Sequence, residues 1–165
     1  MEDVGAGLLV AAVAMFFLAA SIWRHRLDID GKGSGRILLP KEGHKIGRPL
    51  RIDGELSSIE HGHHAWLALE SEHLLFPVEP ELPASGGKFA AEISGEKIPQ
   101  EPFSLQLLLV GAKGQRAIEY WFLQGGLGEG YPGFERVPGA RKLAAVRNLL
   151  PESNLGARLK TASRP

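Results

Sequence analysis

Hydrophobic and polar positions divide this chain into two different parts. Residues 4–23 carry no charged side chain. A helix of about 20 residues rises roughly 30 Å, which matches the hydrocarbon core of a bilayer. From residue 36 onward, apolar residues come instead in short runs that glycine and proline separate. The pattern predicts one membrane-spanning helix followed by a domain built mainly from β-strands.

Short segments with the character of strands follow the first apolar run. In residues 49–59, for example, Leu50, Ile52 and Leu56 fall on alternate positions, as on a half-buried strand. Residues 103–111 form the most apolar of these segments, and we expect this strand to lie centrally in its sheet. The predicted strands are residues 36–40, 49–59, 64–70, 73–79, 88–94 and 103–111.

One later segment changes to helical spacing. Ile118, Trp121 and Phe122 recur at intervals of three and four residues, and Gly125 stands where a helix would end. This spacing predicts a helix over residues 113–124.

Two glycine-rich stretches are similar to phosphate-binding loops only in composition. The sequence GKGSG, residues 31–35, lacks the four-residue spacing that such a loop requires between its first glycine and its Gly-Lys-Ser/Thr. The sequence GGLGEGYPG, residues 125–133, contains no lysine and leaves a predicted helix instead of opening one. We interpret residues 27–35 as a flexible linker and residues 125–133 as a loop that caps the helix.

Charged residues on both sides of the first apolar run predict its orientation. Glu2 and Asp3 precede the run. Trp23 ends it where an interfacial aromatic belongs, and Arg24 and Arg26 follow at the level of the lipid headgroups. Because basic residues beside a span favour the cytoplasmic side, we expect the amino terminus outside and the carboxyl-terminal domain in the cytoplasm. A cleaved signal peptide would need a basic leader and a shorter apolar run.

The overall composition excludes only some classes of function. Nineteen basic side chains balance nineteen acidic ones, so no general basic face predicts a nucleic-acid partner. The chain has no cysteine, which excludes disulfides and thiolate metal sites. No serine stands in a nucleophile-elbow motif, and the carboxylates follow no paired spacing. We therefore expect a non-catalytic protein without a cofactor.

The segment SIEHGHHAW is the one candidate for metal or acid–base chemistry. His61, His63 and His64 lie within four positions, and imidazoles are common ligands of zinc and copper. A metal site needs three or four ligands, however, and only remote residues could complete this one. The other interpretation is a hairpin turn with solvated histidines, in which Gly62 supplies backbone freedom and Trp66 enters the core. We favour the turn and keep a metal-binding or enzymatic module as the alternative.

Two segments resemble bacterial immunoglobulin-like domains. The sequence GRPLRIDGELSSIEHGHHAWLALE, residues 47–70, is similar to their first strands, in which a short glycine turn precedes a strand with a tryptophan. Residues 107–146, which contain the sequences YPG and PGA, are similar to a variant with a helix inserted before the last strand. The resemblance covers residues 36–146 and implies a membrane-anchored immunoglobulin-like sandwich without catalytic residues. It also favours a strand for residues 142–146, whereas the apolar pattern of residues 141–150 fits either a strand or a short helix.

The expected architecture is therefore mainly β, an immunoglobulin-like β-sandwich with one inserted helix, preceded by a single transmembrane helix. The expected boundaries are an anchor at residues 1–26, a linker at 27–35, a sandwich domain at 36–148 and a loose tail at 149–165. The expected function is that of a single-pass protein that contacts the lipid bilayer and binds an unknown protein partner. Aromatic residues dominate binding hot spots, so Tyr120, Tyr131 and Phe134, which flank a long loop, are the candidate contacts.

Overall fold

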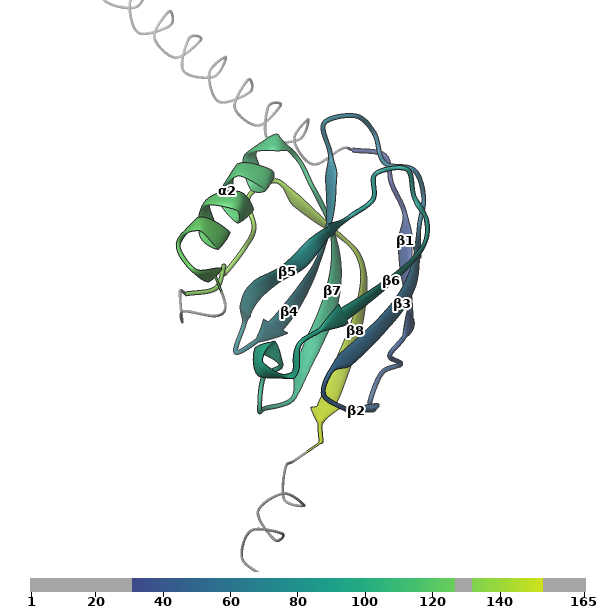
Figure 1. The fold of residues 1–165 in the computed structure, drawn as a ribbon. Coiled ribbons are helices and arrows are strands. Elements are labelled where there is room, and N and C mark those ends of the chain that lie inside the picture. Colours follow the sequence, from purple (N-terminus) through teal and green to yellow (C-terminus); the bar gives the residue numbers. More distant parts are fainter. Residues whose placement is uncertain (1–30, 127–131, 153–165) are drawn as a thin grey trace, which may run out of the picture.

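The computed structural model describes residues 31–126 and 132–152 (Figure 1). In these residues the protein is mainly β. The strands are β1 (Gly35–Leu39), β2 (Lys45–Ile46), β3 (Leu50–Leu56), β4 (His64–Ser71), β5 (Leu74–Leu82), β6 (Gly87–Ile93), β7 (Phe103–Val110) and β8 (Ala140–Pro151), and the helices are α2 (Ala112–Leu123) and the single 3-10 turn η1 (Gly95–Lys97).

The expected anchor, residues 1–26, lies outside the described residues, together with its interfacial residues Trp23, Arg24 and Arg26. Within the two described ranges, no helix has the length and hydropathy needed to span a bilayer. Of the expected tail, only the first residues are described. They extend β8 to Pro151, so this strand runs past the expected domain end at residue 148.

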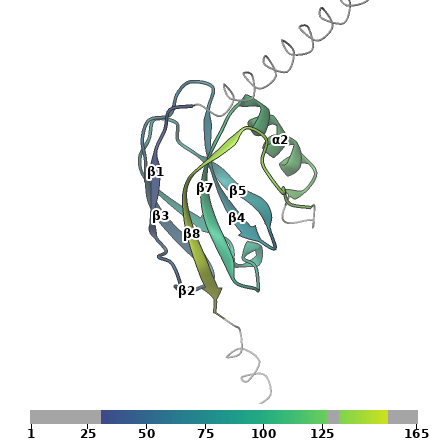
Figure 2. The ribbon, with the colours of Figure 1, turned by 180° about the vertical axis from the view of Figure 1, so that it is seen from behind.

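The strands form two curved sheets that face each other (Figures 1 and 2). One sheet has the order β1-β3-β6 and the other the order β2-β8-β7-β4-β5. Neighbouring strands pair antiparallel except β2 and β8, which pair in parallel. The six strands predicted from the sequence are confirmed, and the most apolar one, β7, lies at the centre of the larger sheet. The two-residue strand β2 is too short to produce a periodic signal.

The main core fills the space between the two sheets. Alternate residues of β3, namely Leu50, Ile52 and Leu56, are buried there, as the period of two in this segment predicts. The larger sheet faces them with buried residues of β4 and β7, among them Leu67 and Leu107. This apolar layer is what holds the two sheets together.

The helix α2 covers the outer face of the larger sheet, where a second and smaller core lies (Figure 1). Trp66 of β4 and Leu108 of β7 are register partners in the same sheet, and both are buried there with Ile118 of α2. The expectation that Trp66 enters the core of the sandwich is wrong. Side chains alternate along β4, so Ala65 and Leu67 face the other sheet while Trp66 faces the helix.

The sequence correctly places a helix before the last strand, and it occupies residues Ala112–Leu123. Residues 141–150, for which the apolar pattern left two possibilities, form most of the strand β8. At Gly114 the helix lies close to the end of β7 and to the segment before β8. A Cβ atom at this position would clash with the carbonyl oxygen of Pro138 and with the side chain of Val110.

Replacing Gly114 by alanine is expected to destabilise the domain by about 1–3 kcal/mol, because overpacking forces the helix away from the sheet. In an exposed helix the same change would stabilise by about 1 kcal/mol. Urea unfolding shows directly whether Gly114→Ala lowers or raises the free energy of unfolding. Ala117→Gly in the same helix serves as the control and should cost about 1 kcal/mol, mainly from helix propensity. A more stable Gly114→Ala variant would contradict the close packing of the helix at Gly114.

Candidate functional site at the histidine segment and helix α2

The histidine segment begins with a tight turn that connects the two sheets. The backbone N–H of His63 donates a hydrogen bond to the carbonyl of Glu60 over 3.1 Å, and Gly62 has a φ of 81°. That angle lies in the left-handed region, which glycine adopts without strain. The turn and its glycine were predicted correctly, but the hairpin was not. The strands on either side, β3 and β4, belong to different sheets.

The three histidines of this segment have different surroundings. His61 is exposed. His63 is half-buried, its ring packs against Gly31, and its Nδ1 atom is buried with no hydrogen-bond partner among the described residues. His64 is also half-buried, and its Nδ1 lies 2.7 Å from Oε1 of Glu81. Only His61 is therefore the solvated turn residue that we expected of all three.

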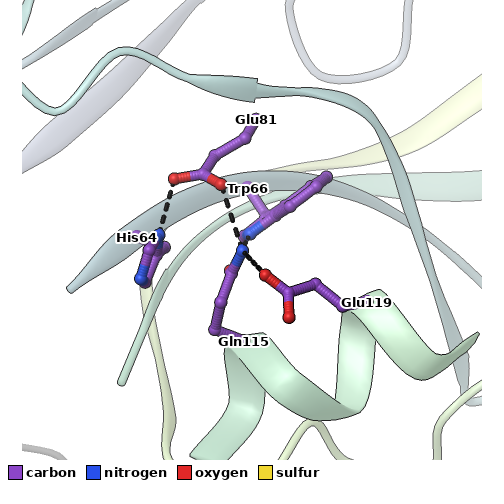
Figure 3. Close-up of polar contacts among 5 residues, drawn as sticks. All are labelled: His64, Trp66, Glu81, Gln115 and Glu119. Carbon is purple, nitrogen blue, oxygen red and sulfur yellow. Dashed lines mark hydrogen bonds and ion pairs between the residues drawn. The ribbon is translucent and has the colours of Figure 1, made fainter. Parts of the chain in front are cut away.

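The pair of His64 and Glu81 is one end of a polar network between β4, β5 and α2 (Figure 3). The amide Nε2 of Gln115 donates to Oε2 of Glu81 over 3.1 Å and to Oε1 of Glu119 over 3.0 Å. The indole Nε1 of Trp66 donates to Oε1 of Gln115 over 2.8 Å. The network therefore ties the helix to two neighbouring strands.

Gln115 stands at the centre of this network because its side chain offers both donors and an acceptor. A carboxylate only accepts hydrogen bonds and an indole N–H only donates one, so neither could link the other groups. Gln115 is only 8% exposed, and a buried amide without partners would destabilise the fold. Here the amide nitrogen of Gln115 donates two hydrogen bonds, and its side-chain oxygen accepts one.

A hollow of about 620 Å³ lies beside the network and is lined by residues 58–64, Glu81, Ala84 and Ser85. An imidazole that a carboxylate orients is the arrangement that general bases use. In the part of the chain that the structure describes, no hydrogen bond joins an imidazole to a serine hydroxyl. Within the same residues, no group of three or more His, Asp or Glu side chains is arranged to hold a metal ion.

The aromatic residues expected to contact a partner are placed differently from one another. Tyr120 lies on the outer side of α2 and is 58% exposed. Phe134 is half-buried, with its ring centroid 6.0 Å from that of Trp121 and its backbone paired with Leu75. Tyr131 lies outside the described residues.

Leu123 is a candidate contact that the sequence reasoning missed. Its side chain is 81% exposed, one helical turn beyond Tyr120 on the same side of α2. A leucine at the end of an apolar helical pattern is normally interpreted as part of the core. The only available signal was its position outside the stripe formed by Ile118, Trp121 and Phe122.

Because comparison with known proteins finds no similar protein, the function must be inferred from this geometry. No family model, no curated protein and no solved structure matches the chain.

Proposed function

We propose that this chain is a non-catalytic binding protein, an immunoglobulin-like domain that a single-pass anchor at residues 1–26 attaches to the lipid bilayer. The strand order supports the immunoglobulin-like part. Immunoglobulin domains place strands A, B and E in one sheet and strands C, F and G in the other, with F between C and G. Here β1-β3-β6 correspond to A-B-E, and β4-β7-β8 correspond to C-F-G. The strand β5 pairs with β4 as strand C′ pairs with strand C.

The position of α2 in this topology carries the proposed binding role. The helix occupies the connection between strands F and G, which in variable domains is one of the recognition loops. Its outer side combines exposed Tyr120 and Leu123 with exposed Lys113 and Arg116, which lie on the same side at helical spacing. A complementary partner is a protein surface with an apolar hollow bordered by acidic groups.

The polar network beneath α2 supports a binding role more strongly than a catalytic one. Gln115 accepts a hydrogen bond from Trp66 and donates one to Glu81, and these two bonds fix the helix on the sheet. A helix held in one position loses little conformational entropy when a partner binds to its outer face. The network thus acts as a support for the binding surface.

The anchor also places the domain on one side of the membrane. The basic residues Arg24 and Arg26 follow the apolar run, and acidic residues precede it. Basic residues beside a span resist translocation and are attracted by anionic lipids. We therefore propose a cytoplasmic domain, which limits its partners to proteins at or near the inner membrane surface.

Replacing Tyr120 and Leu123 together by serine is expected to reduce capture of the protein partner at least tenfold. Truncating a binding hot spot costs about 2 kcal/mol or more, and 1.4 kcal/mol corresponds to a factor of ten. The full chain is extracted with mild detergent from washed native membranes, and bound proteins are quantified by mass spectrometry.

The matched control replaces Leu38 and Leu39 of β1, which are 40% and 43% exposed, by serine. Unfolding midpoints show that both double variants remain folded. Equal capture by the two variants would contradict a partner site on α2. Recovery of the unmodified chain in the soluble fraction would contradict the anchor.

A further inference from the structure

The sequence GKGSG, residues 31–35, is held against the domain although it was expected to be part of a flexible linker. Ser34 and Ser57 are joined by two hydrogen bonds, each of 2.8 Å: the Ser34 backbone N–H donates to the Ser57 hydroxyl, and the Ser57 backbone N–H donates to the Ser34 carbonyl. Arg141 of β8 contacts the same segment. Its Nη2 atom donates to the carbonyls of Gly31 and Gly33 over 2.8 Å and 2.9 Å. The segment leads into the strand β1, not into a helix, so it is no P-loop.

These contacts form one wall of a hollow of about 540 Å³, which is lined by residues 31–34, Ser57, Ser58 and Arg141. The lining contains three serine hydroxyls, an exposed lysine and a half-buried guanidinium. Among the residues that the structure describes, no carboxylate belongs to this lining. The nearby carboxylate of Glu60 accepts a hydrogen bond from the backbone N–H of Lys32 over 3.3 Å, but it lines the neighbouring hollow.

The charge of Arg141 is not balanced within the described ranges of the chain. Its hydrogen bonds there go to carbonyl oxygens, which are dipoles without net charge, and no carboxylate forms an ion pair with it. A guanidinium has five N–H donors, and only those of Nη2 have acceptors among the described residues. A partly buried cation without a counter-charge favours the binding of an anion.

We propose that this hollow binds a phosphate group, and that an anionic phospholipid headgroup supplies it. Guanidinium, ammonium and hydroxyl donors are the groups that bind phosphate oxygens most strongly. Gly31 lies five residues beyond the expected end of the anchor at Arg26, and five residues reach at most about 18 Å. The hollow is therefore within reach of the headgroup layer. The choice of a lipid rests on the proposed anchor, whereas the phosphate site itself does not.

The first arm of the test measures free phosphate. The full chain in micelles of a neutral detergent is titrated with inorganic phosphate by calorimetry. Arg141→Gln is expected to weaken binding about tenfold, and Lys32→Gln severalfold, because each removes a charged donor. Arg147→Gln on the same strand is the control, because Arg147 is exposed and does not line the hollow, and it should leave the affinity unchanged. Unfolding midpoints identify any loss that follows from unfolding.

The second arm measures lipid. Native mass spectrometry counts the lipid molecules retained from micelles doped with either phosphatidylglycerol or phosphatidylcholine. Preferential retention of phosphatidylglycerol that falls in Arg141→Gln and Lys32→Gln supports the proposal. In a second outcome, phosphate binding depends on both residues but lipid retention is the same in both variants. That outcome supports the phosphate site and overturns the lipid as the source of the phosphate. Binding that is insensitive to Arg141 and Lys32 in both arms overturns the site, even if the chain proves to be membrane-anchored.

Discussion

Replacing Trp66 by alanine is expected to lower the free energy of unfolding by about 3–5 kcal/mol, which is typical of a buried aromatic residue. Trp66 is 5% exposed and fills the space between β4 and α2. Its ring centroid lies 5.6 Å from that of Phe122, and its indole N–H bonds to Gln115. The substitution therefore opens a cavity beneath the helix. It also leaves the buried side-chain oxygen Oε1 of Gln115 without its donor. A loss of this size could exceed half the stability of a domain.

Urea unfolding followed by circular dichroism measures this loss. His61→Ala is the control, because an exposed turn residue should change stability by less than about 0.5 kcal/mol. His63 would be a poor control, since its ring packs against Gly31. A cost for Trp66→Ala as small as that for His61→Ala would contradict the second core.

The position of Trp66 could not be predicted because β4 has apolar residues on both faces. The six strands were recognisable from their apolar runs, and the helix from its spacing. In β4, however, residues Ala65 to Leu69 are all buried, so no polar position marks which face is outside. A strand that is covered on both faces has no alternation to read. Only the strand order and the placement of α2 reveal that Trp66 faces the helix.

The polar network was missed because its members are far apart in the sequence. Glu81 and Gln115 are separated by 34 positions, and Trp66 and Gln115 by 49. One local signal was available. Gln115 stands three residues before Ile118 and so falls on the buried stripe of the helix. A polar residue on such a stripe requires a hydrogen-bond partner, although the sequence does not say which one.

The contacts of Arg141 also could not be predicted, because they join residues that are even further apart in the sequence. Arg141 and Gly31 are separated by 110 positions, and composition alone assigns the glycine-rich segment to a linker. The hydrogen bonds to the carbonyls of Gly31 and Gly33 follow from the pairing of β8 with β7, which brings Arg141 opposite Leu109. Gly33 in turn lies against the side chain of Leu109. Local patterns thus predicted the strands, while the candidate sites depend on which strands become neighbours.

Changing Gln115 to glutamate is expected to cost about 3 kcal/mol, because it removes two buried donors and leaves three carboxyl groups facing one another. The new side chain has nearly the same shape, and one of its oxygens still accepts the hydrogen bond from Trp66. The loss therefore measures the missing donors and the repulsion among the carboxyl groups, and not the packing. Glu119→Gln alone should cost less than about 0.5 kcal/mol, since Glu119 is exposed and the amide oxygen still accepts from Gln115.

Combining Gln115→Glu with Glu119→Gln exchanges donor and acceptor across this contact. The amide at position 119 then donates to the carboxylate at position 115, and we expect a recovery of about 1–2 kcal/mol relative to the sum of the single changes. Recovery should be incomplete, because Glu81 still lacks the donor that Gln115 gave it. Unfolding free energies of the four proteins provide the double-mutant cycle. Additive costs would show that residues 115 and 119 are not coupled. The predicted recovery would show that positions 115 and 119 of α2 need one donor and one acceptor between them. The cost that remains would measure the lost hydrogen bond from Gln115 to Glu81, which links α2 to β5.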